Sequence, residues 1–505
     1  MALAGIKLVV HLVTIRGYGY FRDELYYIAC SDHLALGYVD HPPLSVALLK
    51  VWRLAFADSV VAIRILPAIA GALVVLLTGL LAVELGGGRA AVVLAAVGVI
   101  AAPIHLAFDH FYSMNAFDAL VWTLGATLFA RITRSPRPGP LWVGLGVTLG
   151  LGLLNKASVL WFGAGLFAGM LLTPERRHLR TPWPYLAFLI AAGLFLPHVV
   201  WQVQHEWPTL EFMRNAMEKK YVARSAGDFV GEQVLMMNPL SLPIWLAGLV
   251  AALLDRPVKG SEGPAPGSRW VAGIYLTVFA ILIGSKSAKA EYLAAAYPML
   301  FAAGGVFWEK LFAARKIGWA SSVLATLAVL GGAVAAPMVI PILSEERLIA
   351  YSRALGLKVK SAEKKELAEL PQHFADMHGW QEIVAAVASA HGRLTPDERR
   401  GAAILVGNYG EAGAIDLFGG AYGLPRAISG HNNYWLWGPG GANGRVMVLL
   451  GGTRDDHEQT FESVEEAGIV ECTYCMPHEN GKRVFIGRGA KVSMDELWAK
   501  KKRFE

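Results

Sequence analysis

Long apolar runs recur along the first two thirds of the chain and are separated by short charged loops. A membrane-spanning helix needs about 20 apolar residues, and an interfacial or re-entrant segment needs fewer. At Asn155 and Lys156 two short runs meet, which predicts either two short helices joined at a polar hinge or one kinked element. The pattern predicts about eleven transmembrane helices, near residues 1–16, 60–84, 91–108, 116–131, 141–154, 157–172, 185–203, 233–254, 270–285, 292–309 and 318–343.

The charged loops predict which way these helices cross the membrane. If the spans alternate, Lys and Arg gather in the loops on one side, and an excess of these residues is typical of cytoplasmic loops. We therefore expect a multi-pass protein of the cell (inner) membrane with a cytoplasmic N-terminus. The cationic loops hold Arg89, Arg131, Arg134, Arg137, Arg176, Arg177, Arg180, Arg256, Lys259, Arg269, Lys310, Arg315 and Lys316. The extracytoplasmic side then receives residues 17–59, 109–115, 204–232, 286–291 and the tail from 344.

The composition excludes a soluble enzyme. Hydrophobic residues fill 54% of the 505 positions, the mean hydropathy is +0.42, and only 17% of the residues are charged. Ordinary soluble domains carry about 25% charged residues. The formal charge of +6 would suit a nucleic-acid partner. Because much of it lies in short loops between apolar runs, we interpret it as a topology signal and expect no nucleic acid.

The tail from residue 344 has the pattern of a small α/β domain. It predicts a charged helical segment, three short buried strands and a further helical stretch. These lie over residues 344–370, then 402–406, 446–450 and 483–486, and finally 457–466. We therefore divide the chain into a transmembrane domain, 1–343, which includes the extracytoplasmic segment 17–59, and an extracytoplasmic domain, 344–505. Within the first domain, the Pro, Gly and Ser content of residues 255–269 predicts a flexible connector.

The tail also holds two of the three cysteines. Cys472 and Cys475 are separated by two residues, which fits either a local disulfide or two reduced thiols. A zinc site with His478 would need further ligands that the sequence does not offer, so no metal site is expected.

Acidic residues at the edge of the hydrocarbon are costly, which makes them candidates for function. Asp23 and Glu24 follow the first apolar run directly. A carboxylate at a membrane face can act as the general base that deprotonates an acceptor. The alternative is an acid pair that caps a helix N-terminus and balances its dipole.

A second acid, Asp40, precedes His41 and the pair Pro42 and Pro43. The prolines restrict the backbone before them, which favours a preorganised binding segment, although a turn into the next helix would also explain them. Further along, Asp118 lies inside the outer end of a span, where it must have a partner.

Four cationic residues on the predicted outer side could bind a phosphate. Lys156 lies at the outer end of two apolar runs, where it could equally extend to the headgroups. Arg214 lies in loop 204–232, which could also be an interfacial helix. Lys286 and Lys289 put positive charge outside, against the usual bias, which indicates an anionic ligand.

Four segments together resemble one superfamily, the protein O-mannosyltransferases and aminoarabinose lipid A transferases. They read Y-F-R-D-E-L-Y-Y, G-Y-V-D-H-P-P-L, K-A-E-Y-L-A-A-A-Y-P-M-L and S-G-H-N-N-Y-W-L-W-G-P. The likeness covers essentially the whole membrane part, and the bacterial dolichyl-phosphate-mannose-protein mannosyltransferase-like members share the tail. It implies a mostly α, polytopic membrane protein of the GT-C type with a C-terminal soluble α/β domain.

The resemblance also implies an activity. Such proteins are inverting glycosyltransferases that move a hexose or pentose from a polyprenyl-phosphate donor to a lipid, glycan or protein acceptor on the extracytoplasmic face. Asp23 is then the catalytic base, and Glu24 helps to position a substrate. Tyr292 matches a tyrosine near the donor phosphate, and Arg214 matches an outer-loop arginine loosely.

Asp40 and His41 fall where relatives have an acid followed by a donor-phosphate contact. That contact is often Lys in relatives, so His41 is a departure that would make it weaker or pH-dependent. No cofactor is expected, and a divalent cation is compatible but not required, because the donor already carries an anionic leaving group.

Two other functions fit the sequence less well. A multispan transporter or flippase of lipid-linked sugars should place ionisable residues near the bilayer midplane and often has paired halves, whereas here the acids gather at one face. A tail-led binding protein would need one span as an anchor, not about eleven.

Overall fold

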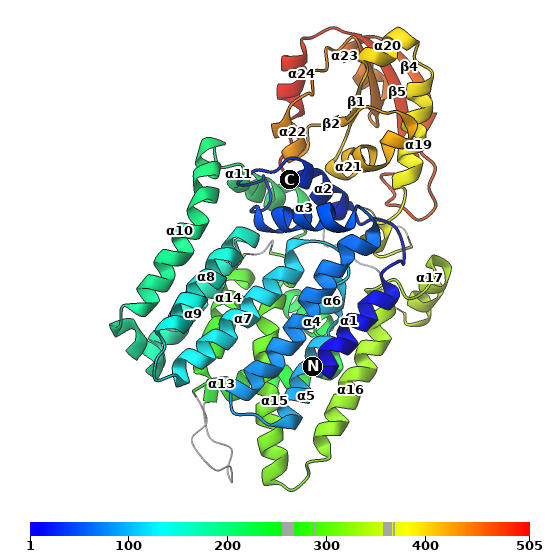
Figure 1. The fold of residues 1–505 in the computed structure, drawn as a ribbon. Coiled ribbons are helices and arrows are strands. Elements are labelled where there is room, and N and C mark those ends of the chain that lie inside the picture. Colours follow the sequence, from blue (N-terminus) through cyan, green and yellow to red (C-terminus); the bar gives the residue numbers. More distant parts are fainter. Residues whose placement is uncertain (255–266, 286–287, 357–365, 367–368) are drawn as a thin grey trace.

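The computed structural model describes residues 1–254, 267–285, 288–356, 366 and 369–505. A bundle of apolar helices carries a small mixed α/β domain at one end (Figure 1). Most of the connector expected at 255–269 lies outside the described residues, as do Lys286 and much of the charged segment expected at 344–370. In that segment the structure describes helix α17 (Glu345–Ala354).

Each of the eleven apolar runs is helical in the described part of the chain. Two runs are broken: residues 91–108 form two helices with a short gap, and residues 233–254 are bent by 86°. The helices are α1 (Ala2–Thr14), α4 (Val60–Glu84), α5 (Arg89–Ile100), α6 (Pro103–Phe108), α7 (Met114–Arg134), α8 (Gly139–Asn155), α9 (Val159–Leu171), α10 (Trp183–Gln204), α12 (Ala226–Met236), α13 (Leu242–Leu254), α14 (Arg269–Gly284), η4 (Ala290–Ala296), α15 (Tyr297–Ala314) and α16 (Ala320–Ala335).

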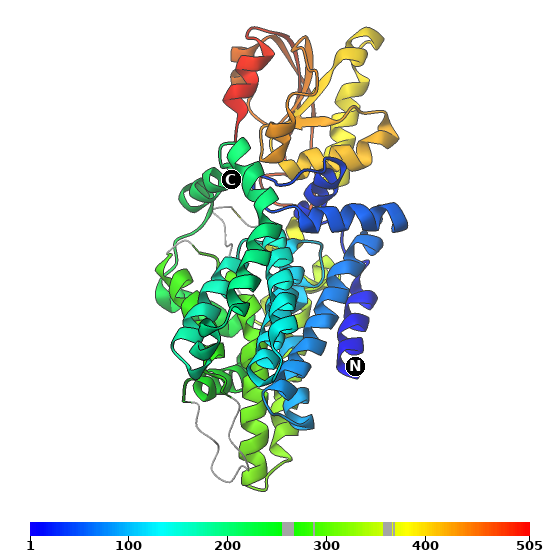
Figure 2. The ribbon, with the colours of Figure 1, turned by 60° about the vertical axis from the view of Figure 1, so that its left-hand side comes forward.

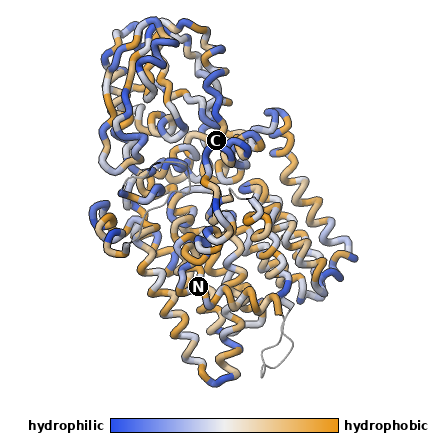
Figure 3. Tube along the Cα trace, turned by 180° about the vertical axis from the view of Figure 1, so that it is seen from behind, coloured by the Kyte–Doolittle hydropathy of each residue, from blue (hydrophilic) through white to orange (hydrophobic). Residues whose placement is uncertain are grey.

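Four helices in the described part are long and apolar enough to cross a membrane alone, and the bent pair of α12 and α13 would make a fifth span. Several other apolar helices have 10–17 residues. The hinge at Asn155 and Lys156 separates two helices, because Lys156 is extended and α9 begins at Val159. Large apolar side chains such as Phe188 and Leu189 of α10 face outward, as lipid contact requires, and apolar residues dominate the bundle (Figure 3).

The segment between α1 and α4 lies across the end of the bundle, beneath the C-terminal domain (Figure 2). It contains helices α2 (Arg22–Asp32) and α3 (Leu44–Phe56). A buried ion pair fixes the bundle nearby, in which Lys7 Nζ of α1 lies 2.9 Å from Asp109 Oδ2. Both charges are almost fully buried, so each needs the other. The segment 17–59 lies between the helices and the C-terminal domain (Figure 2).

The C-terminal domain is built on a five-stranded sheet in the order β2–β1–β3–β5–β4. The strands are β1 (Ala403–Val406), β2 (Ala427–Ser429), β3 (Val446–Leu450), β4 (Phe461–Ile469) and β5 (Arg483–Ala490). β1 runs parallel to both β2 and β3, whereas β5 is antiparallel to β3 and β4. The strands expected at 402–406, 446–450 and 483–486 are therefore confirmed.

Alternate residues of the central strands pack on opposite faces of the sheet, as the period of two in a strand requires. Ile404 and Val448 face the core formed with α19 (Trp380–Gly392) and α21 (Tyr409–Phe418). Leu405 and Leu449 face the core formed with α24 (Met494–Lys501). Both faces are covered, so these strands are apolar throughout.

The helix expected at 457–466 is wrong over most of its length. Helix α23 (Arg454–Thr460) ends early, and the following residues form the edge strand β4. Glu462 and Glu465 point outward from that strand while Phe461 and Ala467 are buried. Charges spaced along an exposed edge strand imitate a helical pattern, and pairing with β5 decides the outcome.

Candidate active site

Asp23 lies in the first turn of α2, at the junction of the bundle and the C-terminal domain. Its side chain is 35% exposed. Tyr409 of α21 donates a hydrogen bond of 2.9 Å from its hydroxyl to Asp23 Oδ1. Arg22 approaches the same oxygen with Nε at 3.6 Å, and its Nη1 lies 3.6 Å from Asp376 Oδ1. Asp23 is thus an accessible carboxylate held between two domains.

Glu24 has a different environment from its neighbour. Its carboxylate is fully buried and forms an ion pair with Arg64 of α4, with Nη2 2.9 Å from Oε2. It also accepts the backbone N–H groups of Phe21 and Tyr112, each at 2.9 Å. The first of these bonds caps α2, so Glu24 does what the helix-capping alternative describes. The geometry favours a positioning role for Glu24, since none of its oxygens faces open space.

The loop that presents Tyr409 is fixed by its own sequence. After β1, Asn408 caps α21 by accepting the N–H groups of Gly410 and Glu411. The Tyr409 ring stacks on Tyr26 of α2 at 4.4 Å and on His431 at 4.6 Å. The hydroxyl therefore reaches Asp23 from a ring that is held on both faces.

His431 supports this loop as a neutral ring. Burial, reinforced by the charge of Arg503, lowers the pKa of His431 well below its ordinary value. Its Nδ1 accepts the Tyr409 N–H at 3.3 Å, and its Nε2 lies 3.0 Å from the backbone oxygen of Glu505. A neutral imidazole can accept at one nitrogen and donate at the other, as this geometry needs.

Beneath the loop, Glu411 and Glu479 share Lys482. Lys482 Nζ lies 2.8 Å from Glu479 and in direct contact with Glu411, which is fully buried. Burial, followed by the negative charge of Glu479, raises the pKa of Glu411 to about 7. Glu411 also accepts the Gly407 N–H at 2.7 Å, so this cluster stiffens the loop that carries Tyr409.

Asp40 and His41 lie on the other side of Tyr26. The Tyr26 hydroxyl donates to Asp40 Oδ1 at 3.0 Å, and Asn432 of the tail donates to Asp40 Oδ2 at 3.3 Å. Burial raises the pKa of the Asp40 carboxyl, and the negative charge of Asp23 adds to this rise. His41 is buried and stacks on Tyr27 at 4.7 Å. Asp40 therefore contacts the tail through Asn432, whereas the His41 ring packs against Tyr27.

A cleft between the two domains adjoins Asp23. It encloses ≈ 400 Å³, and both contacts of Asp23, Arg22 and Tyr409, line it. We call it the interdomain cleft. Cations dominate its charged lining, with Glu505 as the one acid among the lining residues in the described part of the chain. The lining residues are Arg22, Lys219, Lys220, Gly407, Asn408, Tyr409, His431, Leu450, Gly451, Gly452, His478, Lys482, Arg503 and Glu505.

A second group of predicted residues comes together where α7, α9 and η4 meet. Lys156 Nζ lies 3.3 Å from Asp118 Oδ2 and 5.4 Å from the centre of the Tyr292 ring. Ser158 donates to the other Asp118 oxygen at 2.7 Å, which confirms that Asp118 has partners. We call this group, with Lys289 and Tyr221, the lysine–tyrosine cluster.

Lys289 joins the lysine–tyrosine cluster through Tyr221. Its Nζ lies 5.0 Å from the centre of the Tyr221 ring, and the Tyr221 and Tyr292 hydroxyls are 3.3 Å apart. Lys219 and Lys220, the two residues before Tyr221, line the interdomain cleft. A single segment of the outer loop therefore borders both the interdomain cleft and the lysine–tyrosine cluster.

Arg214 is the predicted residue that neither group includes. It lies exposed on α11 (Pro208–Asn215) and is not part of the cleft lining. On the same helix, Glu211 pairs with Lys502 at 2.7 Å and Asn215 donates to the Phe504 oxygen at 2.8 Å. The helix serves to dock the tail.

Cys472 and Cys475 form a disulfide, the first of the two alternatives that the sequence left open. The His478 ring instead faces Glu479, at 3.2 Å. Among the described residues no three His, Cys, Asp or Glu side chains converge as metal ligands would.

Sequence reasoning missed several residues of the cleft, namely Arg22, Tyr409, Lys482 and Arg503. Each is ordinary in its local sequence and gains meaning only from a partner far along the chain. One signal was available, because the S-G-H-N-N-Y-W segment of the tail supplies Asn432 and Asn433 to the segment 17–59, where the Asn433 side chain accepts the Val39 N–H at 2.7 Å.

The comparisons with known proteins agree with this architecture. The family model described as dolichyl-phosphate-mannose-protein mannosyltransferase matches residues 40–201. The structure of ArnT from Cupriavidus metallidurans bound to undecaprenyl phosphate is similar, with a TM-score of 0.60 and 15% identity over 96% of this chain and 97% of that one. The oligosaccharyltransferase AglB from Archaeoglobus fulgidus, in complex with an inhibitory peptide and a dolichol-phosphate, gives a TM-score of 0.51 and 13% identity over 89% and 69%. The curated proteins contain no match.

At such identities the structural likeness is one of fold. The chain is a polytopic membrane protein with a small C-terminal sheet domain. This likeness confirms the GT-C type of fold that the resemblance implied, and the family-model match over residues 40–201 agrees with it.

Proposed function

We propose that this protein is an inverting glycosyltransferase that takes a sugar from a polyprenyl-phosphate donor at the extracytoplasmic face of the cell membrane. The observation that carries the proposal is the position of Asp23. Its accessible carboxylate accepts a hydrogen bond from Tyr409 beside a cationic cleft. The family match and the polyprenyl phosphates bound to ArnT and AglB support the donor class.

In the proposed reaction Asp23 is the general base. Its carboxylate takes the proton of an acceptor hydroxyl or amine, and the acceptor atom attacks the anomeric carbon of the sugar. The bond from that carbon to the phosphate oxygen breaks, and the electron pair leaves with the polyprenyl phosphate. A positioned base contributes about 10²–10⁴-fold to such a step.

The leaving phosphate needs positive charge where it departs. Lys156 and Lys289 of the lysine–tyrosine cluster supply this charge, and Tyr292 offers a hydroxyl between them. Asp40 and His41 border the proposed site next to Tyr26. This mechanism does not require a metal ion, because the lysines act on a leaving group that is already anionic.

The proposed topology follows from the same site. The segment 17–59, the outer loop and the tail all meet at one end of the bundle (Figure 1). Placing that end outside the cytoplasm agrees with the cationic loops at the other end and with the Cys472–Cys475 disulfide, since disulfides persist in oxidising compartments.

Purified protein in nanodiscs, supplied with polyprenyl-phosphate sugars labelled in the sugar, tests the proposal. We expect cleavage of the donor and transfer to an acceptor or to water. Asp23→Asn should lower the rate by about 10³-fold while donor binding changes less than about twofold.

Asp32→Asn, on the same helix but paired with Lys50 and Arg53, is the matched control and should keep most of the activity. Full activity of Asp23→Asn would reassign the base. Movement of the lipid across the bilayer without bond cleavage would instead identify a flippase.

A further inference from the structure

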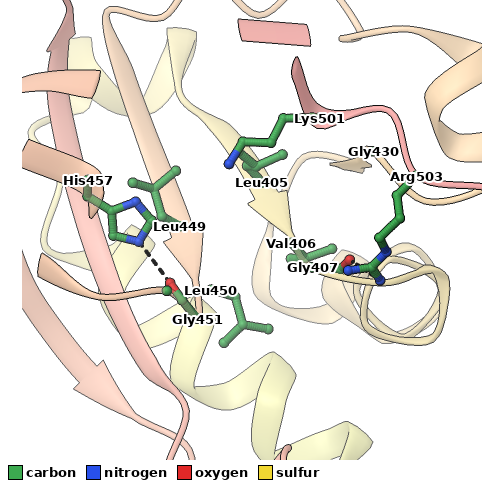
Figure 4. A pocket seen from close by; sticks show the side chains of 11 residues that line it. Leu405, Val406, Gly407, Gly430, Leu449, Leu450, Gly451, His457, Lys501 and Arg503 are labelled. Carbon is green, nitrogen blue, oxygen red and sulfur yellow. Dashed lines mark hydrogen bonds between the residues drawn. The ribbon is translucent and has the colours of Figure 1, made fainter. Parts of the chain in front are cut away.

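A second cavity lies inside the C-terminal domain, at the carboxyl ends of β1 and β3 (Figure 4). It encloses ≈ 210 Å³. Its floor is apolar, with Leu405 and Leu449 among the lining residues, and glycines form its edge. Lys501 and Arg503 approach from one side and His457 from the other.

This position has a topological reason. β1 leads through α21 to β2 on one side of the sheet, whereas β3 leads through α23 to β4 on the other side. The connections that leave the neighbouring parallel strands β1 and β3 therefore run in opposite directions. Open α/β sheets bind ligands at such switch points. We call this space the switch-point cavity.

Glycine is required at the edge of the switch-point cavity. Gly451 and Gly452 follow β3 with φ of 82° and 78°, in the region that disfavours other residues. A Cβ on Gly452 would also lie 2.8 Å from the His457 ring, whose Nε2 is 2.8 Å from the Gly451 oxygen. The backbone at this edge therefore carries no side chains, which is typical of places where a ligand approaches the backbone closely.

The charge of the switch-point cavity is positive. The lining residues in the described part of the chain include Lys501 and Arg503 and no acid. The Arg503 guanidinium donates to the Gly407 oxygen at 2.9 Å and pairs with Glu505 at 3.1 Å, outside the lining. The cavity is smaller than the roughly 300–1,000 Å³ of sites for drug-sized ligands, so it suits a single sugar ring.

The switch-point cavity and the interdomain cleft share an edge. Both are lined by Gly407, Gly451, Gly452 and Arg503. The lining of the cleft also includes Arg22 and Tyr409, the contacts of Asp23. A molecule seated in the cavity can therefore continue into the cleft towards Asp23.

We propose that the switch-point cavity binds an anionic sugar residue of the acceptor, with its apolar face on Leu405 and Leu449 and its carboxylate or phosphate on Lys501 and Arg503. The sugar or group to be glycosylated then lies further along the same molecule, in the interdomain cleft. This inference rests on the proposed function and names the class of acceptor.

Binding to the purified full-length protein tests this without a donor. Glucuronate and glucose 6-phosphate should bind at least tenfold more tightly than glucose, and more tightly than inorganic phosphate. Lys501→Gln should weaken binding of both acids about tenfold. Its side chain is exposed, so the fold should survive. Lys500→Gln, the adjacent exposed lysine outside the lining, is the matched control and should bind as the unmodified protein does.

Equal binding of glucose and glucuronate, or unchanged binding by Lys501→Gln, would overturn the proposal. So would binding of inorganic phosphate alone. Competition by an acidic glycolipid in nanodiscs would identify a lipid-linked acceptor, and competition only by soluble acidic oligosaccharides a free glycan. Asp23→Asn should bind the sugar acids normally, so failure of the proposed catalysis and failure of this site give different results.

Discussion

The Tyr409 hydroxyl donates a hydrogen bond of 2.9 Å to Asp23 Oδ1, although the two residues are 386 positions apart in the chain. The two residues belong to different domains, and each lies in the first turn of its helix. This bond joins the candidate base to the C-terminal domain. A domain that only recognised acceptors from a distance would not need to touch the base, so we interpret the tail as part of the active site.

Removing that hydroxyl should slow transfer. Tyr409→Phe keeps the ring stacked between Tyr26 and His431 but deletes the hydrogen bond to Asp23. A hydrogen bond to a charged group is worth about 1.5–3 kcal/mol, so we expect kcat to fall by about tenfold or more. The measurement is the rate of labelled sugar transfer. Tyr422→Phe, at an exposed tyrosine, is the control, and equal rates for both variants would contradict the role of Tyr409.

Glu24 should matter for stability before it matters for chemistry. Glu24→Gln breaks the fully buried pair with Arg64 and leaves an uncompensated charge, which costs about 3–5 kcal/mol in comparable cases. We expect a clear drop in the midpoint of thermal unfolding in detergent. Glu84→Gln, which removes the partner of the half-exposed Arg131, should shift the midpoint far less. Normal stability of Glu24→Gln together with lost activity would return Glu24 to a catalytic role.

The lysine–tyrosine cluster should govern donor affinity. Lys156→Gln and Lys289→Gln each remove one positive charge from the proposed phosphate site, and we expect the donor KM to rise about tenfold with a smaller change in kcat. Steady-state kinetics with varied donor concentration gives both values. Lys310→Gln, near the C-terminal end of α15, should leave KM unchanged. A rise in acceptor KM alone would place the acceptor, not the donor, at this cluster.

The buried carboxyl of Glu411 should make stability depend on pH. Its pKa is raised from 4.5 to about 7, so between these values the folded protein binds more protons at this group than the unfolded chain does. Stability of the unmodified protein should therefore fall relative to Glu411→Gln as the pH rises from 4.5 to about 7, and the difference should level off above that. Unfolding midpoints of both proteins over this range give the comparison, and a constant difference would exclude the effect.

Much of the architecture could be predicted from the sequence. All eleven apolar runs are helical and three strands of the tail lie where they were expected, because burial in lipid or in a covered sheet requires locally apolar residues. Predictions that depend on pairing did less well. The helix expected at 457–466 gave way to β4, whose partner β5 lies further along the chain.

The candidate site shows the same difference between features that depend on local sequence and features that depend on distant contacts. Asp118, Lys156, Lys289 and Tyr292 were predicted separately, and the structure brings them together through side-chain contacts. Asp23 and Glu24 were predicted as a pair, and the structure gives them different environments, since Asp23 is partly exposed and Glu24 is buried against Arg64. Adjacent residues on a helix point about 100° apart, so neighbours in sequence seldom share a site.

Three properties could be read from the sequence alone: this chain lies in a membrane, its acids gather at one end of the helices, and a further domain follows. Hydrophobicity and charge act locally, so these properties are readable position by position. Other properties depend on the folded arrangement of the chain. Tyr409 and Arg22 flank Asp23, and Arg503 borders two adjoining cavities. Those relationships exist because packing brings distant segments within hydrogen-bonding range, and nothing in the composition of either segment specifies its partner.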